Sequence, residues 1–340
     1  MDNIKIINGI SEVIEGEKLG IPLATENNMS DIGRVITGDV KTANKFLNAL
    51  VNKIAMQVVE TKMYTNHLAQ LKTGKMPLGD TVESLYTNPS NGENFNPSDT
   101  SKSLFTRKKP DVKAIYHTIN RQKQFTVTVN HLELKDAFSS QNAFSSLVNS
   151  IISSLYSGNA IDEFIAYKEL MGSAMEKNYC KKLEITKPNG DIANSKKLVK
   201  DIANLSDIMV FPSSENNAFS TLKPGEVATT WTEKSDQLLI LDVATKNDID
   251  MDVLANAFNM DKATIQANTI YVDNFGVDSE GAKRKMSGLI ADKGYFRILE
   301  SFNMTTDFFN SQTLDYNYYL TVQEVIGVCP FANATAIVYA

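Results

Sequence analysis

The stretch FSSLVNSIISSLY (144–156) carries the strongest pattern in this 340-residue chain. Its apolar residues recur at intervals of three and four, while serine and asparagine fill the opposite face, as in an amphipathic helix. After Gly158 the pattern resumes with Ile161, Phe164 and Ile165, so we expect one long helix that bends near the glycine. Such a helix needs a sheet or another helix to pack against.

Upstream of this helix, the sequence predicts an arm, a helix and a hairpin. The first forty residues show little periodicity and are expected to be extended, whereas 42–59 has helical spacing. Turn residues punctuate 76–99, with the pair Asn91-Gly92 as the best hairpin signal. The alternation of apolar and polar residues over 125–130 predicts a strand, which we interpret as one arm of a long β-hairpin around a polar tip.

Downstream of the helix, the pattern is that of mixed helix and sheet. Residues 198–211 predict a helix that leads into a strand ending at Pro212, and 252–258 predict a further helix. Short apolar runs predict buried strands at 237–244 and 268–275. The last sixty residues contain strand-like alternation at 289–299, 315–328 and 334–340. We interpret Tyr316, Tyr318 and Tyr319 as packing residues of such a strand.

Charge is distributed unevenly along the chain, whose net charge is −6. Residues 101–125 hold seven basic side chains against one acid, whereas 201–280 hold fourteen acids against four bases. Solvated surface loops of opposite sign would explain this equally well. The alternative is that the two regions meet across neighbouring molecules, where complementary charge sets the register.

No motif for catalysis or for a cofactor stands out. Phosphate-binding, dinucleotide-binding, nucleophile-elbow and zinc-protease patterns are all missing, and Cys180 and Cys329 stand far apart. Asp248, Asp250 and Asp252 resemble the start of a calcium loop, but valine and asparagine replace its glycine and its final glutamate. We therefore expect no enzyme activity, no cofactor and no metal, and we expect the two thiols to be free.

The chain is also expected to lack membrane and secretion signals. No apolar run reaches the ~18 residues of a membrane helix, and the N-terminus has no basic region followed by an apolar stretch.

Several segments resemble the major capsid proteins of short-tailed phages of the phi-twenty-nine type, a branch of the Hong Kong 97 capsid fold. The most specific is DYNYYLTVQEVIGVCPFANATAIV (315–338), in which the tyrosine cluster, the strand and the FANA turn occur in order. The other segments are IPLATENN (21–28), MPLGDTVESLYTN (76–88), KPDVKAIYHTINRQ (109–122), LELKDAF (132–138), LVNSIISSLY (147–156), AIDEF (160–164), DMDVLANAFNM (250–260) and NTIYVDNF (268–275).

This resemblance implies an α+β fold with five parts. They are an N-terminal arm and helix (1–65), an E-loop β-hairpin (66–130), a peripheral domain with a spine helix (131–200), an axial domain (201–280) and a return to the peripheral sheet (281–340). Relatives that carry an immunoglobulin-like domain or a scaffolding segment differ from this chain, so separate proteins are expected to supply those functions.

The resemblance further implies a shell subunit that forms pentamers and hexamers around double-stranded phage DNA. It would reside in the virion capsid, and in the host cytoplasm during assembly, with portal, scaffolding or decoration proteins as partners and DNA bound non-specifically. The E-loop would cross the adjacent subunit, so its cations are candidate intersubunit contacts or, alternatively, face the DNA. They are Arg107, Lys108, Lys109, Arg121 and Lys123. A cellular nanocompartment shell and a ligand- or calcium-binding module are the alternatives to the phage shell.

Overall fold

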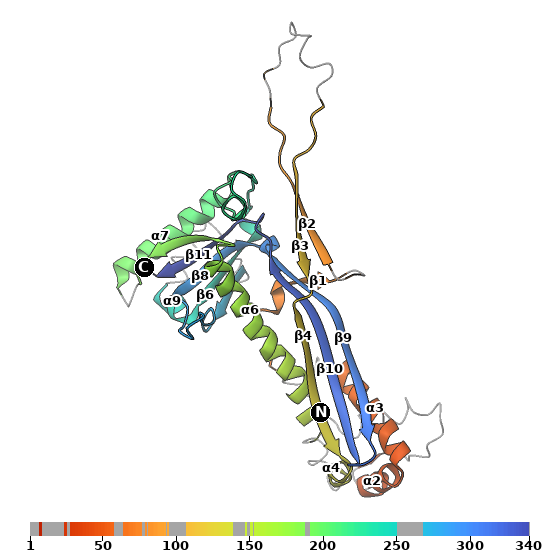
Figure 1. The fold of residues 1–340 in the computed structure, drawn as a ribbon. Coiled ribbons are helices and arrows are strands. Elements are labelled where there is room, and N and C mark those ends of the chain that lie inside the picture. The colour runs from red at the N-terminus through yellow and green to blue at the C-terminus, as the bar shows by residue number, and fades with distance from the viewer. Residues whose placement is uncertain are drawn as a thin grey trace. The chain divides into compact units, whose positions relative to one another are not determined.

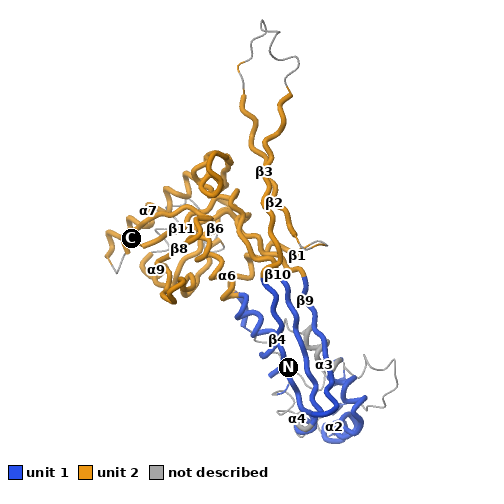
Figure 2. Tube along the Cα trace, viewed as in Figure 1, with its two compact units in different colours: residues 1–66, 121–163, 302–323 blue, residues 67–120, 164–301, 324–340 orange. Residues whose placement is uncertain are grey.

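The computed structural model divides the chain into two compact units, shown in Figure 2. Unit 1 contains 1–66, 121–163 and 302–323, and unit 2 contains 67–120, 164–301 and 324–340. The structure describes residues 7–8, 24–25, 28–57, 64–76, 79, 81–92, 94, 107–138, 147, 150–151, 153–187, 191–249 and 268–339. These residues form helices and sheets in an α+β architecture, as expected.

The helices of unit 1 correct the prediction of an extended arm over the first forty residues. Helix α2 (Met29–Thr37) lies within that stretch and buries Met29, Ile32 and Ile36, which recur at intervals of three and four residues. This periodic run is short and is surrounded by polar residues, which weakens its helical pattern in the sequence. Helix α3 (Val40–Gln57) follows and confirms the helix predicted at 42–59. A third helix, α4 (His131–Ala137), comes after the strand at 121–130.

The long helix has an irregular turn where a bend was expected. Residues 153–157 form a π-helical turn, η4 (Ser153–Ser157), and α6 (Gly158–Glu176) begins at the glycine itself. Before and within this turn the predicted face is confirmed, because Ile151 and Leu155 are fully buried and Ser150 is exposed. Phe144, Val148 and Ile152 lie outside the described residues.

After the π-helical turn the predicted face is only partly the buried one. Phe164 is partly buried and packs against the core that contains Tyr167 and Met171, as predicted. Ile161 and Ile165 are 46% and 51% exposed, so the prediction is wrong for these two residues. A π turn holds one more residue than an α turn, which rotates the following positions by about 100° around the helix axis, so the buried face does not continue at α-helical spacing.

One sheet of four strands has the order β1-β9-β10-β4 (Figure 1). The strands are β1 (Lys72–Lys75), β4 (Arg121–Asn130), β9 (Phe296–Asn310) and β10 (Asp315–Val328). Burial alternates residue by residue along most of β10, and Tyr316 and Tyr318 are 2% and 1% exposed. The tyrosines are therefore core residues, as predicted, and Tyr319 is half-buried.

The hairpin lies within the expected range 66–130, but its second strand is not the run at 125–130. Strands β2 (Thr81–Thr87) and β3 (Val112–Thr118) pair antiparallel in an isolated two-stranded sheet, from Thr81 opposite Thr118 to Thr87 opposite Val112. The alternating run at 125–130 belongs to β4, which lies beside β10 in the four-stranded sheet. Its assignment to the hairpin was wrong, because alternation identifies a strand and not its partner.

The second large sheet has five strands in the order β5-β11-β8-β6-β7. These are β5 (Lys181–Ile185), β6 (Gln237–Asp242), β7 (Thr269–Val272), β8 (Met286–Asp292) and β11 (Ala334–Tyr339). β6 and β7 confirm the two predicted buried strands. The segment 281–340 is divided between the two large sheets, because β8 and β11 pair with each other here, whereas β9 and β10 belong to the four-stranded sheet.

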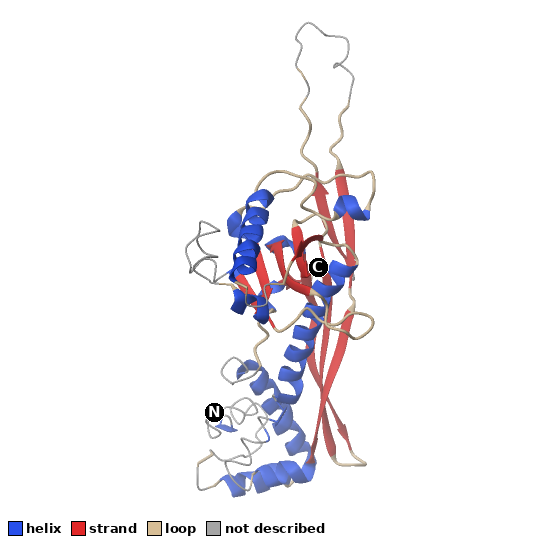
Figure 3. Ribbon diagram, turned by 90° about the vertical axis from the view of Figure 1, so that its left-hand side faces the viewer, coloured by secondary structure: helices blue, strands red, loops and turns tan. Residues whose placement is uncertain are grey.

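Helices cover both faces of this sheet (Figure 3). Helix α7 (Ile192–Met209) begins at Asp191, whose carboxylate accepts a hydrogen bond from the Ala193 amide at 2.9 Å. The strand predicted before Pro212 is not formed, since α7 continues to Met209 and Phe211 is exposed. The remaining elements are η3 (Ala69–Leu71), α8 (Phe219–Leu222), η5 (Lys234–Asp236), α9 (Val243–Asp248) and η6 (Lys293–Tyr295).

Candidate functional site

The inner face of the β2–β3 hairpin packs on the loop segments of unit 2. The ring of Tyr86 stacks on Phe331 with centroids 5.5 Å apart, and its hydroxyl donates a hydrogen bond to the Thr229 carbonyl. Ile115 packs against the same small core, in which Phe219 is buried. An isolated two-stranded hairpin is only marginally stable in water. These contacts therefore hold the hairpin against its own chain.

Polar contacts fix the hairpin just beyond the last paired residues. The Asn88 side-chain amide donates to an Asp111 carboxylate oxygen and to the Val227 carbonyl, both at 2.6 Å. Its carbonyl oxygen accepts from the Thr229 amide at 3.0 Å. One asparagine thus ties both arms of the hairpin to the loop at 227–229.

Lys113 adds an ionic contact between the basic and acidic regions within the same chain. Its Nζ lies 3.3 Å from an oxygen of Asp111 and 3.3 Å from one of Glu226. The hydrogen bond from Asn88, followed by the one from Lys113, lowers the pKa of the Asp111 carboxyl. The sequence had suggested that such charges meet across molecules, and at this position they meet within one.

Three of the five predicted site residues lie together and are exposed. Arg107, Lys108 and Lys109 are consecutive and precede Pro110 and Asp111, which are also exposed. We call 107–109 the cationic segment. Lys102, which belongs to the same basic region of the sequence, lies outside the described residues.

The other two predicted site residues are not on the hairpin. Arg121 lies on β4, its side chain is 5% exposed, and its Nε and Nη2 donate to Asp162 at 3.0 and 2.8 Å. Nη2 also donates to Asn159 at 2.9 Å. Lys123 is more exposed and has its Nζ 3.7 Å from Asp162. This pair therefore belongs to β4, where Arg121 is bonded to Asp162 of α6.

The outer face of the hairpin carries apolar residues that sequence analysis did not select. Leu85, Val112 and Tyr116 are 63%, 54% and 65% exposed. They occupy alternate positions on the two strands, on the face opposite Tyr86 and Ile115. The sequence alternates between apolar and polar residues over 81–87 and 112–118. This alternation predicts two strands, but it does not show which face of the hairpin packs on the rest of the chain.

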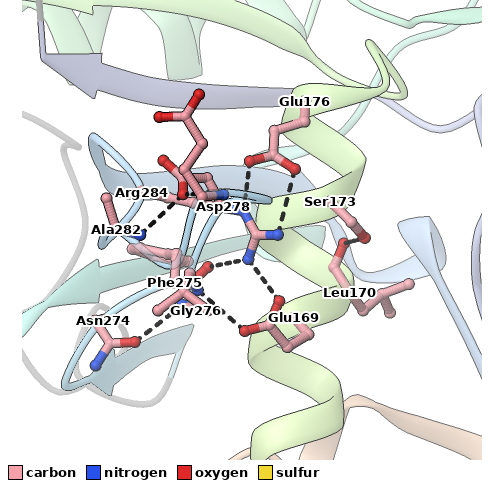
Figure 4. Close-up of polar contacts among 12 residues, drawn as sticks. Glu169, Leu170, Ser173, Glu176, Asn274, Phe275, Gly276, Asp278, Ala282 and Arg284 are labelled. Atoms are coloured by element: carbon pink, nitrogen blue, oxygen red, sulfur yellow. Dashed lines mark hydrogen bonds and ion pairs between the residues drawn. The ribbon is translucent and has the colours of Figure 1, made fainter.

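A second polar cluster fixes the loop after β7 to α6 (Figure 4). Arg284, whose side chain is 7% exposed, donates from Nη1 to Glu169 at 2.6 Å and from Nε to Glu176 at 2.8 Å. Nη1 also donates to the Phe275 carbonyl at 3.1 Å. Burial of Arg284 lowers its pKa, but the hydrogen bonds to Glu176 and Glu169 outweigh that effect and raise it overall.

Two glycines allow this close approach. Gly276 has φ +79°, and a Cβ atom there would overlap the Glu169 carboxylate. A Cβ atom on Gly172 would overlap the Phe275 carbonyl and the Arg284 side chain. The cluster therefore depends on glycine on both the helix and the loop. All its charges are paired, which is typical of a structural clamp.

The described residues contain no cluster of three or more potential metal-binding side chains. Asp248 ends α9, while Asp250 and Asp252 lie outside the described residues. Cys180 and Cys329 form no disulfide, as predicted, and both are buried, which raises the pKa of the Cys180 thiol to about 11. In the part of the chain that the structure describes, no helix is long and apolar enough to cross a membrane.

The fold is that of a phage capsid protein of the Hong Kong 97 type. The capsid structure of Staphylococcus phage Andhra matches with a TM-score of 0.68 at 12% identity, covering 82% of this chain and 86% of the other. The capsid structure of Cyanophage P-SCSP1u matches with a TM-score of 0.53 at 11% identity, covering 83% and 89%. At these identities the likeness defines the fold alone.

Sequence comparison gives the family. The model of the Phi29-like phage major capsid protein matches residues 6–338, and the chain belongs to this family. The major capsid protein of Bacillus phage B103 is 28% identical over 99% of this chain and 73% of its own length. That of Streptococcus phage Cp-1 is 29% identical over 86% and 82%. The chain is a shell-forming structural protein of the virion, and these comparisons give no support to the nanocompartment or ligand-binding alternatives.

Proposed function

We propose that this capsid protein forms pentamers and hexamers that enclose double-stranded phage DNA, with the β2–β3 hairpin lying on an adjacent subunit. One observation carries the proposal: the hairpin is fixed to its own chain on one face only. Its other face leaves Leu85, Val112 and Tyr116 in solvent, next to the exposed cationic segment. Clustered apolar residues beside like charges are typical of an interaction surface.

Arg107, Lys108 and Lys109 are the proposed intersubunit contacts. Exposed ion pairs contribute only about 0.2–1 kcal/mol each, so no single cation is expected to be essential. Together they would favour one register between subunits and raise the association rate. We do not propose Arg121 for this role, because its guanidinium already donates hydrogen bonds to Asp162 and Asn159 within the chain. Lys123 remains a weaker candidate beside it.

The remaining parts of the proposal concern partners. A portal and separate scaffolding or decoration proteins are proposed to act with the shell, and the DNA is proposed to contact its inner face without sequence specificity. The proposed role is structural, without catalysis. The family membership supports this role, since the matching relatives are named as major capsid proteins.

The test is the double variant Arg107→Glu with Lys108→Glu, examined by electron microscopy for empty shells and for DNA-filled particles. We expect neither to form, because the reversed charges repel the acidic partner. The matched control is Lys196→Glu with Lys197→Glu, two consecutive exposed lysines on α7, which should assemble normally. Normal empty shells with failed DNA retention would instead assign the cationic segment to the DNA-facing surface.

A further inference from the structure

An exposed apolar surface lies in unit 2 where α7 ends. Ile208, Phe211 and Trp231 are 53%, 67% and 49% exposed. Their two segments are adjacent, because the Thr232 amide donates to the Met209 carbonyl at 2.8 Å. We call Ile208, Phe211 and Trp231 the aromatic patch.

The backbone beneath the aromatic patch is held by several hydrogen bonds. Ser213 and Thr230 exchange two backbone hydrogen bonds of 3.0 Å, and the Asn216 side-chain amide donates to the Ile208 carbonyl at 3.3 Å. Single exposed apolar residues are ordinary on protein surfaces, but a group of them on a fixed backbone is not. Tryptophan in particular is enriched among the residues that dominate binding energy at interfaces.

Acidic residues occur in the same segments as the aromatic patch. Asp207, Glu215 and Glu233 are all exposed, and they belong to the same two segments, 207–215 and 230–234. Lys234 is the one base in these two segments, and its Nζ lies 2.6 Å from Asp207. The surface therefore combines an apolar centre with an excess of negative charge.

We propose that the aromatic patch is the surface of one subunit on which the hairpin of a second copy docks. This rests on the proposed function, because it identifies the partner surface of the same hairpin. The hairpin presents the complementary pair of features: Leu85, Val112 and Tyr116 for the apolar centre, and the cationic segment for the carboxylates.

A second copy fits better than the hairpin of the same chain. The chain's own hairpin is attached to the neighbouring loop through its inner face, where Tyr86 and Asn88 bond to 227–229. Its outer apolar residues remain in solvent, so they do not cover the patch of their own chain. A contact of this kind joins different surfaces of two identical subunits, which forms a ring when the rotation between neighbours closes.

The first test uses Trp231 as a built-in probe, since it is the only tryptophan in the chain. Its fluorescence is measured in the unassembled full-length protein and in purified shells, together with quenching by acrylamide. Docking predicts a blue shift of the emission and a severalfold loss of quenching on assembly. Emission and quenching that stay unchanged in intact shells would overturn the proposal.

The second test identifies the occupant by charge exchange. On its own, the double variant Glu215→Lys with Glu233→Lys should abolish shells. Combined with Arg107→Glu and Lys108→Glu, it should restore them. One outcome is that the hairpin variant, Arg107→Glu with Lys108→Glu, fails to assemble and is not rescued by the exchange. In that case the proposed docking site is wrong, even if Trp231 is buried in shells, but the proposed role of the hairpin stands. If the hairpin variant assembles normally, both the role and the docking site are wrong.

Discussion

The five-stranded sheet and the β2–β3 hairpin both belong to unit 2, yet they place their apolar side chains differently. Along β6, β8 and β11, nearly every residue is buried, because helices lie on both faces of the sheet. Along β2 and β3, one face packs on the chain and the other is exposed, with Tyr116 65% accessible.

This difference distinguishes the apolar surface that one subunit buries by itself from the apolar surface that remains exposed until assembly. A strand buried on both faces has no surface left to offer, so substitutions there should act on folding. A strand with an exposed apolar face adds little to the stability of one subunit, so substitutions there should act on shell formation. Among the described strands, none pairs with either outer edge of the hairpin, and most proteins protect such edges from other chains.

The largest effect on stability is expected from Ile240→Ala in the middle of β6. Ile240 is fully buried, so losing its side chain should lower the free energy of unfolding by about 2–5 kcal/mol. Leu85→Ala on the hairpin is the matched control and should change it by less than about 0.5 kcal/mol. Urea unfolding of the unassembled protein measures both. Equal losses would show that the outer face of the hairpin is already covered within one subunit.

A smaller loss is expected from Arg284→Ala. The substitution leaves Glu169 and Glu176 without their partner, but these carboxylates are 39% exposed and regain water, so we expect about 1–3 kcal/mol. Lys293→Ala is the control, because its ion pair with Asp236 is 3.9 Å long and exposed. Thermal or urea unfolding compares them. A negligible effect at Arg284 would show that the loop is held by its backbone alone.

His117 at the end of β3 should make stability depend on pH. Burial, with the charge of Arg297 as a further cause, lowers its pKa below the ordinary 6.5. The unfolded chain therefore takes up a proton in a range where the folded chain does not. Neutral His117 therefore contributes its full stabilisation above pH 6.5. This contribution should be lost as the pH falls from 6.5 to the lower pKa of His117 in the folded protein.

The check on this prediction is His117→Gln, with urea midpoints measured above and below pH 6.5. The variant should flatten the pH dependence in that window. A midpoint that rises as the parent protein is acidified would contradict the stated direction of the shift. Ser84, whose hydroxyl lies 3.2 Å from His117 Nε2, accepts from Arg297 Nε at 3.3 Å and keeps the charge of Arg297 close to the ring.

The smallest effect is expected from Lys109→Gln. One exposed ion pair contributes about 0.2–1 kcal/mol, so shell yield should change little and unfolding not at all. Particle counts by electron microscopy, beside the Arg107→Glu, Lys108→Glu variant, measure this. Complete loss of shells from Lys109→Gln alone would indicate a buried contact with specific geometry in place of a shared electrostatic one.

Much of the fold could be predicted from local sequence pattern, because burial on one or both faces leaves a period. β6, β7, β10 and α3 all confirm predictions of that kind. Pairing between strands could not be predicted. β3 and β4 both alternate, yet one pairs with β2 and the other lies beside β10, some 200 residues away in sequence.

The candidate site shows the same limit for charges. Arg107 and Arg121 belong to one basic stretch, and nothing in its composition separates them. The structure does so through Asp162, which is 41 residues from Arg121 and reaches it only because α6 lies beside β4 in unit 1. The aromatic patch could not be predicted either. The sequence pattern places Phe211 at the end of a buried strand, whereas in the structure it follows the end of α7 and is exposed.

The position of β11 has a consequence for how the protein is made. β11 lies between β5 and β8, pairing parallel with one and antiparallel with the other, so neither strand has its full set of partners before residues 334–339 are synthesised. Roughly forty residues separate β8 from β11, which takes a ribosome about 2–8 seconds at ordinary rates. During that interval the gap is open to a strand of another chain. The protein must therefore close this sheet with its own β11 faster than it meets the exposed strands of other copies.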